Sequence, residues 1–460
     1  MIKIVLRSIQ IRISVDLFLI FFYTYFRKYV GRKHNMERKI NLYLLKWKSD
    51  LVRKPLLIYG PKQIGKTFSV LEFGEKEYKN VVYFNTSNNK ELVDLLIKEK
   101  STERIILSLS LMSGETILKD DTLIVFDNVD NVEVVKTIKL FGSELSQYHI
   151  VMITSKRENV SKYKGEELQF KSMYGMDFEE YLWARGEKEL SNMIRECFEK
   201  RKTCPFHRLA LDLFNEYLST GGMPEVVVSN ISGVSEFKIS AIKQKIIDVY
   251  KRQFIDSVSL IDTERSILVY DSIPYQLKKE NRKFQYGLLG FGRRKKEFDG
   301  AIEYLVANQI LYRSYKISDV RSPLSSCRDL DSFKLYLNDE GLLYSMLHLT
   351  KKDIISNEKI KKVLYENHIA KTLVEANYPL YYYQSDGKAE VDFVIQNRMG
   401  KIIPIELATM SNSKAKSLSV FMKRYTVGEA YRVTENNFLT KKDVRYLPIY
   451  AIFCLNDLKI

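Results

Sequence analysis

The chain has 460 residues and a mass of 54.0 kDa, enough for roughly two to four domains. Hydrophobic residues make up 45% of it and aromatic residues 12%, which excludes a disordered or collagen-like chain. Lysine and arginine exceed the acids by 73 to 57, a net charge of +16. This balance suits phosphate-bearing partners, and it equally suits lysine-rich solvated surfaces. The four cysteines lack metal-binding or disulfide spacing, so we expect reduced thiols and a cytoplasmic protein.

The N-terminal segment contains one apolar run, Leu17–Phe26. It is about half as long as the ~20 residues that a membrane-spanning helix needs. Arg27 and Lys28 follow it in place of a small-residue cleavage site, which speaks against a secretory signal, the alternative interpretation. We therefore expect no membrane association. We treat residues 1–35 as an extension upstream of a start at Met36.

Short apolar runs alternate with helical stretches over the first third of the chain. Such runs, bounded by polar or turn residues, are typical of buried parallel strands that helices cover on both faces. The pattern predicts an α/β domain over residues 36–175. Its expected strands are Pro55–Tyr59, Val81–Phe84, Leu123–Phe126 and Ile150–Ile153, and its expected helices include Lys90–Lys100 and Val132–Gln147.

After residue 175 the pattern becomes helical and then mixed. Helices are expected at Phe178–Arg185, Leu190–Arg201 and His207–Leu218, followed by a helix breaker at Gly221–Pro224. The last third predicts one helix and then strands. The helix is Val363–Ala376, and the strands are Leu380–Tyr383, Val391–Ile395 and Ile402–Leu407.

One segment carries a phosphate-binding signature. The run Gly60-Pro61-Lys62-Gln63-Ile64-Gly65-Lys66-Thr67 matches G-x-x-x-x-G-K-[ST] and lies between a predicted strand and a predicted helix. In such a loop the backbone N–H groups face the phosphates. Lys66 can reach the β- and γ-phosphates, and the Thr67 hydroxyl can bind Mg²⁺. The sequence therefore predicts ATP and Mg²⁺ as cofactors.

A partner motif follows at the end of a later strand. Asp127 ends the apolar run Leu123–Phe126, where a carboxylate can complete the Mg²⁺ shell. The next residue is Asn128, which cannot accept a proton from water, so we expect weak hydrolysis. Asp130 lies two residues further on. Thr154, at the end of another strand, is either a sensor of the γ-phosphate or an ordinary strand-end threonine.

Several motifs, taken in order, resemble one protein family. The chain is similar to uncharacterised archaeal and bacterial AAA-type P-loop ATPases that carry a C-terminal restriction-endonuclease-like domain of unknown function. The resemblance covers roughly residues 37–410. It rests on Lys54–Thr67, Thr122–Val129, Met173–Trp183, Gly221–Val227, Asp339–Leu343, Glu366-Asn367, Glu390–Phe393 and Ile405–Leu407.

The resemblance implies a domain order. It implies a P-loop core over residues 36–175, a helical lid over 176–250, a winged-helix-like basic segment over 251–330 and an α/β nuclease-like domain over 331–460. In that last domain Glu366, Asp392 and Glu406 fall on the metal-binding positions. The usual lysine is replaced by Ala408, so we expect a vestigial nuclease site. ATPases of this type often form homo-oligomers, which stays open here.

The segment Lys278–Lys296 is strongly basic. It holds eight lysine and arginine residues against one acid, with three glycines and three aromatic residues interleaved. Phosphate contacts combined with base stacking use these residue types, so DNA is a candidate partner. A solvated lysine-rich loop has the same composition, and the sequence does not separate the two interpretations.

Overall fold

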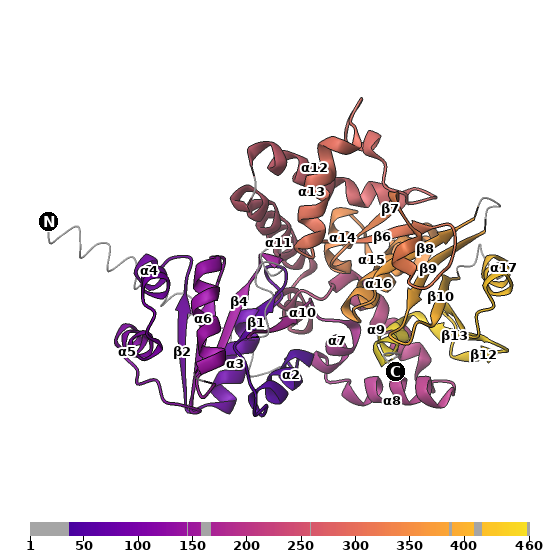
Figure 1. Ribbon diagram of the computed structural model, residues 1–460. Coiled ribbons are helices and arrows are strands. Elements are labelled where there is room, and N and C mark those ends of the chain that lie inside the picture. Colours follow the sequence, from indigo (N-terminus) through magenta and orange to yellow (C-terminus); the bar gives the residue numbers. More distant parts are fainter. Residues whose placement is uncertain are drawn as a thin grey trace.

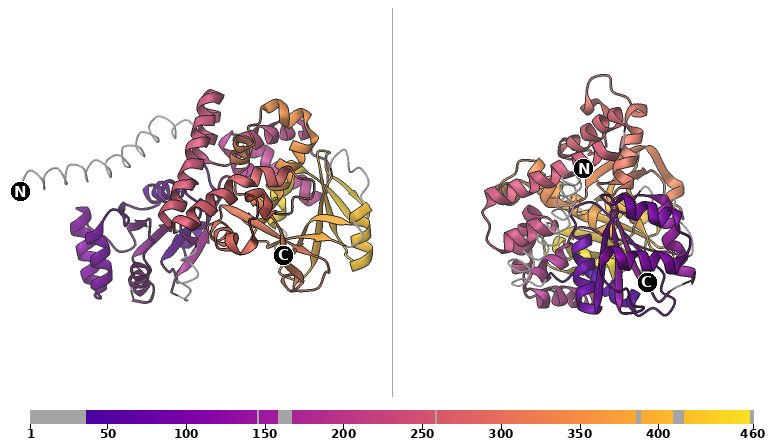
Figure 2. Two further views of the ribbon diagram at one scale, coloured as in Figure 1. Left: turned by 90° about the horizontal axis from the view of Figure 1, so that it is seen from above. Right: turned by 90° about the vertical axis from the view of Figure 1, so that its left-hand side faces the viewer.

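The structure, a computed structural model, describes residues 36–144, 146–157, 167–257, 259–385, 389–408 and 416–457 (Figure 1). The expectation about residues 1–35 falls outside these ranges. Two sheets lie at opposite ends of the molecule, with helices between them (Figures 1 and 2). None of the described helices is long and apolar enough to cross a membrane.

The first sheet has five parallel strands in the order β2-β3-β4-β1-β5. The four expected strands are confirmed as β1, β2, β3 and β4. Both central strands β3 and β4 are buried along their whole length, as expected for a parallel sheet covered on two faces. The strands are β1 (Leu56–Tyr59), β2 (Asn80–Asn85), β3 (Thr122–Asp127), β4 (His149–Thr154) and β5 (Gln169–Ser172).

Helices cover the two faces of this sheet. α2 (Lys39–Lys48) and α3 (Lys66–Glu77) share one apolar core with alternate residues of β1, β3 and β4. The remaining alternate residues pack on the opposite face. That face is covered by α4 (Lys90–Lys98), α5 (Thr102–Ser113) and α6 (Val132–Glu144).

A run of helices joins the two sheets. The helices expected between residues 178 and 218 are confirmed, and Pro224 starts a further helix at its first position, where its missing N–H costs nothing. The lid limit that the family resemblance places at 250/251 falls inside one continuous helix, α11. The helices are α7 (Phe178–Ala184), α8 (Lys188–Lys200), α9 (His207–Thr220), α10 (Pro224–Ile231), α11 (Glu236–Ser257), α12 (Leu260–Lys278) and α13 (Lys295–Ala307).

The second sheet is mixed and has eight strands in the order β12-β13-β11-β10-β9-β8-β6-β7. The three strands expected between residues 380 and 407 are confirmed as β8, β9 and β10. The strands are β6 (Leu311–Ile317), β7 (Arg328–Leu337), β8 (Leu380–Gln384), β9 (Glu390–Gln396), β10 (Ile402–Leu407), β11 (Ala430–Thr434), β12 (Leu439–Lys441) and β13 (Val444–Pro448).

The antiparallel pair β6–β7 forms one edge of this sheet, with β6 pairing in parallel with β8. The domain limit expected at 330/331 therefore cuts the C-terminal sheet, because β6 and the start of β7 precede it. The hairpin that a winged-helix interpretation would treat as a wing is hydrogen-bonded into this larger sheet. Further helices here are α14 (Glu340–Met346), α15 (Lys351–Ser356), α16 (Glu358–Glu375) and α17 (Lys416–Tyr425).

One apolar core runs through both halves of the molecule. It includes residues of β1 and α3, residues of α7 and α9, and residues of α16 and β10. The five-stranded sheet and the eight-stranded sheet are thus packed through shared helices rather than joined only by a loop.

Candidate nucleotide site

The phosphate-binding loop lies where β1 ends and α3 begins. Gly65 is the N-cap of α3 and has a φ of +86°, a left-handed conformation that favours glycine. Gly60 is just as constrained, because a Cβ there would lie 2.2 Å from the carbonyl oxygen of Met173. The sequence motif therefore corresponds to a real backbone geometry, with the first N–H groups of α3 facing outward.

The motif lysine is folded back onto its own loop. Its Nζ donates hydrogen bonds to the carbonyl oxygens of Gly60 at 2.9 Å and Pro61 at 2.7 Å. Burial lowers the pKa of Lys66 to about 8, against the opposing influence of Asp127. A phosphate group at this place would supply oxygens to the same ammonium group.

Asp127 and Thr67 meet beside the loop. Thr67 Oγ1 donates to Asp127 Oδ2 at 2.7 Å, and the hydroxyl of Tyr83 donates to the same oxygen at 3.0 Å. The backbone N–H of Asn128 binds Asp127 Oδ1 at 2.7 Å. Hydroxyl and carboxylate oxygens are the ligands that Mg²⁺ prefers, so this pair fits a nucleotide-bound magnesium ion. Tyr83 was missed from sequence, because nothing in strand β2 marks it.

Asn128 stands in the left-handed region with a φ of +56°, which asparagine tolerates better than most residues. Its side-chain amide donates to Asn85 Oδ1 at 3.3 Å. The Thr154 hydroxyl donates to Asp130 Oδ1 at 3.0 Å, and Lys156 Nζ lies 3.0 Å from the other Asp130 oxygen. The hydroxyl of Thr154, the candidate sensor, therefore already donates its hydrogen bond to Asp130.

A cavity of about 610 Å³ lies at the phosphate-binding loop. All predicted loop residues from Lys62 to Thr67 except Ile64 line it, together with Asp127, Asn128 and Thr154; Gly60, Pro61 and the buried Ile64 shape the loop behind it. Pro224 and Glu225 at the start of α10 also line it. The helix breaker Gly221–Pro224 marks that position in the sequence, but the sequence did not predict that it lines a pocket.

Two residues that carry no sequence signal donate hydrogen bonds to carbonyl oxygens of the loop. Arg38 Nη1 donates to the carbonyl oxygen of Ile64 at 3.1 Å, and its Nη2 donates to that of Tyr174 at 2.9 Å. The hydroxyl of Tyr250, on α11, donates to the carbonyl oxygen of Lys62 at 3.2 Å. The loop conformation therefore depends on the helices that lead to the C-terminal half.

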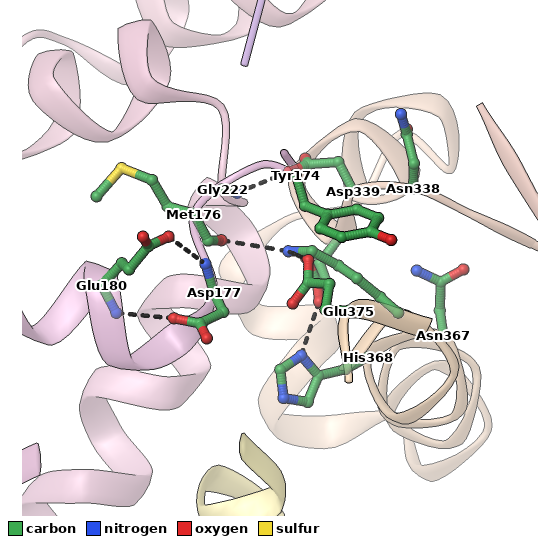
Figure 3. Close-up of polar contacts among 12 residues, drawn as sticks. Tyr174, Met176, Asp177, Glu180, Gly222, Asn338, Asp339, Asn367, His368 and Glu375 are labelled. Atoms are coloured by element: carbon green, nitrogen blue, oxygen red, sulfur yellow. Dashed lines mark hydrogen bonds and ion pairs between the residues drawn. The ribbon is translucent and has the colours of Figure 1, made fainter. Parts of the chain in front are cut away.

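A buried network of polar contacts, called here the polar seam, joins those helices to α14 and α16 of the C-terminal half (Figure 3). We define it as Met176, Gly222, Asp339, Glu340, His368 and Lys371. Lys371 Nζ contacts Glu340 Oε2 at 2.9 Å and the carbonyl oxygen of Met176 at 3.3 Å. Gly222 N–H donates to Asp339 Oδ2 at 2.7 Å, and His368 Nδ1 lies 2.7 Å from Glu340 Oε1. Three of the sequence motifs meet here, and backbone groups of two of them, at Met176 and Gly222, bind the side chains of Lys371 and Asp339.

The three carboxylates expected at the nuclease-like site each have a partner from the chain itself. Glu366 is bound by Arg282, Lys334 and Tyr336. Asp392 Oδ2 accepts from the Leu407 N–H at 2.8 Å, and Glu406 Oε2 lies 3.3 Å from Arg432 Nε. Within the described ranges, no three Asp, Glu, His or Cys side chains are arranged to hold a metal ion. The three carboxylates therefore do not fit a shared metal.

The pKa values at this cluster diverge. Burial alone would raise the pKa of Glu366, but Arg282 and Lys334 outweigh it and lower this pKa to about 2. Burial raises the pKa of Glu406 to about 7, against the effect of Arg432 and with a contribution from Asp392. One carboxylate is thus firmly ionised, and the other titrates near neutral pH.

Most of the basic segment Lys278–Lys296 lies at the surface. Phe291 has a fully exposed side chain, and Arg293, Arg294 and Lys296 are exposed beside it. Among its lysines and arginines Arg282 is the exception, because it is buried, as are the apolar Phe284 and Leu289.

Comparisons with known sequences match three stretches of the chain. Residues 52–182 match the profile of the AAA domain. Residues 211–353 match a domain of unknown function (DUF8612), and residues 361–452 match another (DUF4143). Among proteins with curated descriptions, none matches the chain. The N-terminal part is therefore an AAA-type P-loop domain with an α/β fold.

Solved structures give distant likenesses. The RuvB Holliday junction branch migration motor of Thermotoga maritima is 13% identical, with a TM-score of 0.28, covering 62% of this chain and 90% of its own. The Aeropyrum pernix ORC1 protein in complex with DNA is 14% identical, with a TM-score of 0.26, covering 70% and 91%. Nothing about this chain's activity follows from TM-scores of this size.

Proposed function

We propose that the protein binds ATP together with Mg²⁺ in the cavity at the phosphate-binding loop and hydrolyses it slowly. The observation that carries this proposal is the 2.7 Å contact between Thr67 Oγ1 and Asp127 Oδ2 beside the buried Lys66. A hydroxyl and a carboxylate held together next to a phosphate-binding lysine are what a nucleotide–magnesium complex requires.

The roles of the residues follow from their positions. The N–H groups at the start of α3 bind phosphate oxygens, and Lys66 exchanges its two carbonyl partners for the β- and γ-phosphates. Thr67 and Asp127 hold Mg²⁺, which neutralises charge on the phosphates when bound. Tyr83 keeps the carboxylate of Asp127 oriented.

Slow hydrolysis follows from the residue after Asp127. The amide of Asn128 cannot accept a proton, so it cannot act as a general base toward water. The nearby carboxylate of Asp130 is bound on one oxygen by Thr154 and on the other by Lys156. Those contacts must loosen before Asp130 acts on water.

The test is calorimetry of the full chain with ATP and Mg²⁺, followed by single-turnover hydrolysis. We expect micromolar binding, loss of binding in Lys66→Ala, and a faster single turnover in Asn128→Glu. The matched control is Lys76→Ala, an exposed lysine on the same helix, which should bind ATP normally. Absence of ATP binding to the natural chain would remove the proposal.

A second candidate function is nucleic-acid binding through the segment Lys278–Lys296. The observation that favours it is the exposed ring of Phe291 next to exposed Arg293 and Arg294. Aromatic stacking and phosphate contacts combine in this way in single-strand binding. We expect salt-dependent binding of a single-stranded oligonucleotide, measured by fluorescence anisotropy.

The control for this experiment separates local from global charge. Arg293→Gln with Arg294→Gln and Phe291→Ala should weaken binding about tenfold or more. Lys98→Gln with Lys136→Gln removes as much charge from the exposed surface of the ATPase domain and should leave affinity nearly unchanged. Equal losses in both variants would mean non-specific attraction to a basic protein.

For the C-terminal domain we propose a nuclease-like fold without nuclease activity. Ala408 stands where such a site needs lysine, and Glu366 is held by two cations. We expect no nicking of supercoiled plasmid with Mg²⁺ or Mn²⁺. Nicking that disappears in Asp392→Ala would contradict this.

A further inference from the structure

Arg282 differs from every other cation of its basic segment. Its side chain is buried, and its backbone has a φ of +46°, in the left-handed region that arginine rarely adopts. Nη1 of the guanidinium donates to Glu366 Oε2, and Nε donates to the carbonyl oxygen of Leu277 at 3.2 Å. A strained backbone and a buried charge persist only where the surrounding contacts hold them.

Glu366 is held from its other side as well. Lys334 of β7 places Nζ 3.4 Å from Glu366 Oε1 and 2.9 Å from Glu390 Oε1. Tyr336, on the same strand, donates its hydroxyl to Glu366 Oε1 at 2.6 Å. Both oxygens of Glu366 therefore have partners, and its side chain has no exposed surface.

These contacts compete directly with a metal ion. A divalent cation at Glu366 would have to displace Arg282 and Lys334, which would leave the buried Arg282 without its carboxylate and Lys334 with Glu390 alone. Glu406 also has a cation of the chain beside it, Arg432. Two of the three carboxylates are therefore paired with the chain's own cations.

We propose that the carboxylate cluster of the C-terminal domain, Glu366, Asp392 and Glu406, binds Arg282 of the same chain as an internal counter-ion. Together with Lys334, this arginine takes the place at Glu366 that a metal would hold in a nuclease-like site. The buried ion pair attaches the N-terminal part of the basic segment Lys278–Lys296, at Arg282, to helix α16. This role is separate from ATP binding and does not depend on it.

The first measurement is hydrogen–deuterium exchange of the full chain. In Arg282→Gln and in Glu366→Gln, we expect the amides of residues 279–294 to exchange at least tenfold faster. The amides of β1, β3 and α3 should keep their natural rates, and ATP affinity should not change. Combining the two substitutions should add little to either one, because both remove the same contact. Arg294→Gln, an exposed arginine of the same segment, is the matched control and should exchange like the natural chain.

The second measurement concerns the metal. Asp127→Asn removes the magnesium ligand of the nucleotide site, and calorimetric titration of this variant with Mn²⁺ then reports on the C-terminal cluster. We expect no binding in the micromolar range. Micromolar Mn²⁺ binding that disappears when Glu366→Gln is added would overturn the proposal.

Unchanged exchange of residues 279–294 in both Arg282→Gln and Glu366→Gln would also overturn it. If Arg282→Gln does not fold, Arg282→Lys takes its place, since it keeps the charge and loses the planar fork. That variant should exchange faster than the natural chain over residues 279–294 alone. Hydrogen–deuterium exchange of residues 279–294 at the natural rate in Arg282→Lys would contradict the proposal that the carboxylate cluster binds Arg282.

Discussion

The hydroxyl of Thr67 and the carboxylate of Asp127 are 2.7 Å apart although 60 residues separate them in the chain. The contact exists because β1, which leads into the loop, and β3, which ends at Asp127, are parallel and flank β4. Their carboxyl ends therefore reach the same edge of the sheet. This edge, where Gly60 and Thr154 also lie, is where open α/β sheets bind ligands.

Magnesium dependence should follow this pair. In Asp127→Asn or Thr67→Ala, we expect the affinity for ATP with Mg²⁺ to fall at least about tenfold, ~1.4 kcal/mol. Affinity measured with EDTA should stay the same, because Lys66 and the loop amides remain. Tyr83→Phe removes only the hydroxyl that orients Asp127, so its loss should be smaller. Calorimetry with and without Mg²⁺ checks this, and equal losses under both conditions would assign Asp127 to folding instead of metal binding.

The ATPase domain should lose stability in acid through His149. Its Nδ1 lies 2.6 Å from the Tyr78 hydroxyl and its Nε2 lies 3.2 Å from Asp120 Oδ1. Burial and the nearby cations Arg53 and Lys48 lower the pKa of His149 to about 4, against the effect of Asp120. In the unfolded chain this pKa is about 6.5. Between these values the unfolded state binds more protons, so the contribution is complete above pH 6.5 and is lost as the pH falls toward 4.

Thermal unfolding at several pH values checks this effect. As the pH falls from 6.5 to 4, the midpoint temperature of unfolding should decrease more steeply for the natural chain than for His149→Asn. The control is His348→Asn, a surface residue, which should follow the natural chain. Parallel curves for the natural chain and His149→Asn would show that other groups cause the acid loss.

The geometry of the loop Gly60–Thr67 and its closeness to Asp127 were predictable because their signal is local. Eight consecutive residues define the loop, and a short apolar strand followed by Asp127 defines its partner. Each of these patterns lies within one strand–loop–helix unit, so spacing along the chain translates directly into geometry. The parallel strands were predictable for the same reason, since continuous apolar runs leave few other buried arrangements.

The residues that hold the site and the domains together were not predictable from local pattern. Arg38 reaches Tyr174 across 136 positions, and Arg282 reaches Glu366 across 84. Neither arginine differs in sequence from the many surface cations of this basic chain. The expected domain limit also separated β6 and the start of the edge strand β7 from their sheet, because the pairing of β6 with β8 crosses more than 60 residues.

Breaking the polar seam should destabilise the whole molecule. Lys371 is 1% exposed and is bound by Glu340, Tyr217 and Met176. Lys371→Met removes the lysine beside the buried Glu340 and leaves it the His368 ring and the Tyr217 hydroxyl, so we expect a loss of about 3–5 kcal/mol in the free energy of unfolding. Lys359→Met, an exposed lysine on the same helix, should change it by less than about 0.5 kcal/mol. Urea denaturation followed by circular dichroism measures both, and a loss below about 1 kcal/mol for Lys371→Met would mean that the seam contributes little net stability.

A last prediction concerns the link from the seam to the nucleotide. Tyr250 donates its hydroxyl to the carbonyl oxygen of Lys62 and accepts from Asn338 Nδ2 at 3.3 Å. Asn338 directly precedes Asp339 of the seam, so one hydroxyl joins the phosphate-binding loop to the C-terminal half. In Tyr250→Phe the loop carbonyl loses its partner, and we expect ATP affinity to fall about fivefold, ~1 kcal/mol.

Tyr270 provides the matched control. It is as deeply buried, packs edge to face against Tyr250 at 6.4 Å, and its hydroxyl has no hydrogen-bond partner among the described residues. Tyr270→Phe should therefore leave ATP affinity unchanged and should not reduce stability. Calorimetry of both variants decides whether the loop senses this contact. Equal ATP affinity in Tyr250→Phe and the natural chain would mean that the loop holds its shape without α11, and that Arg38 suffices as its support.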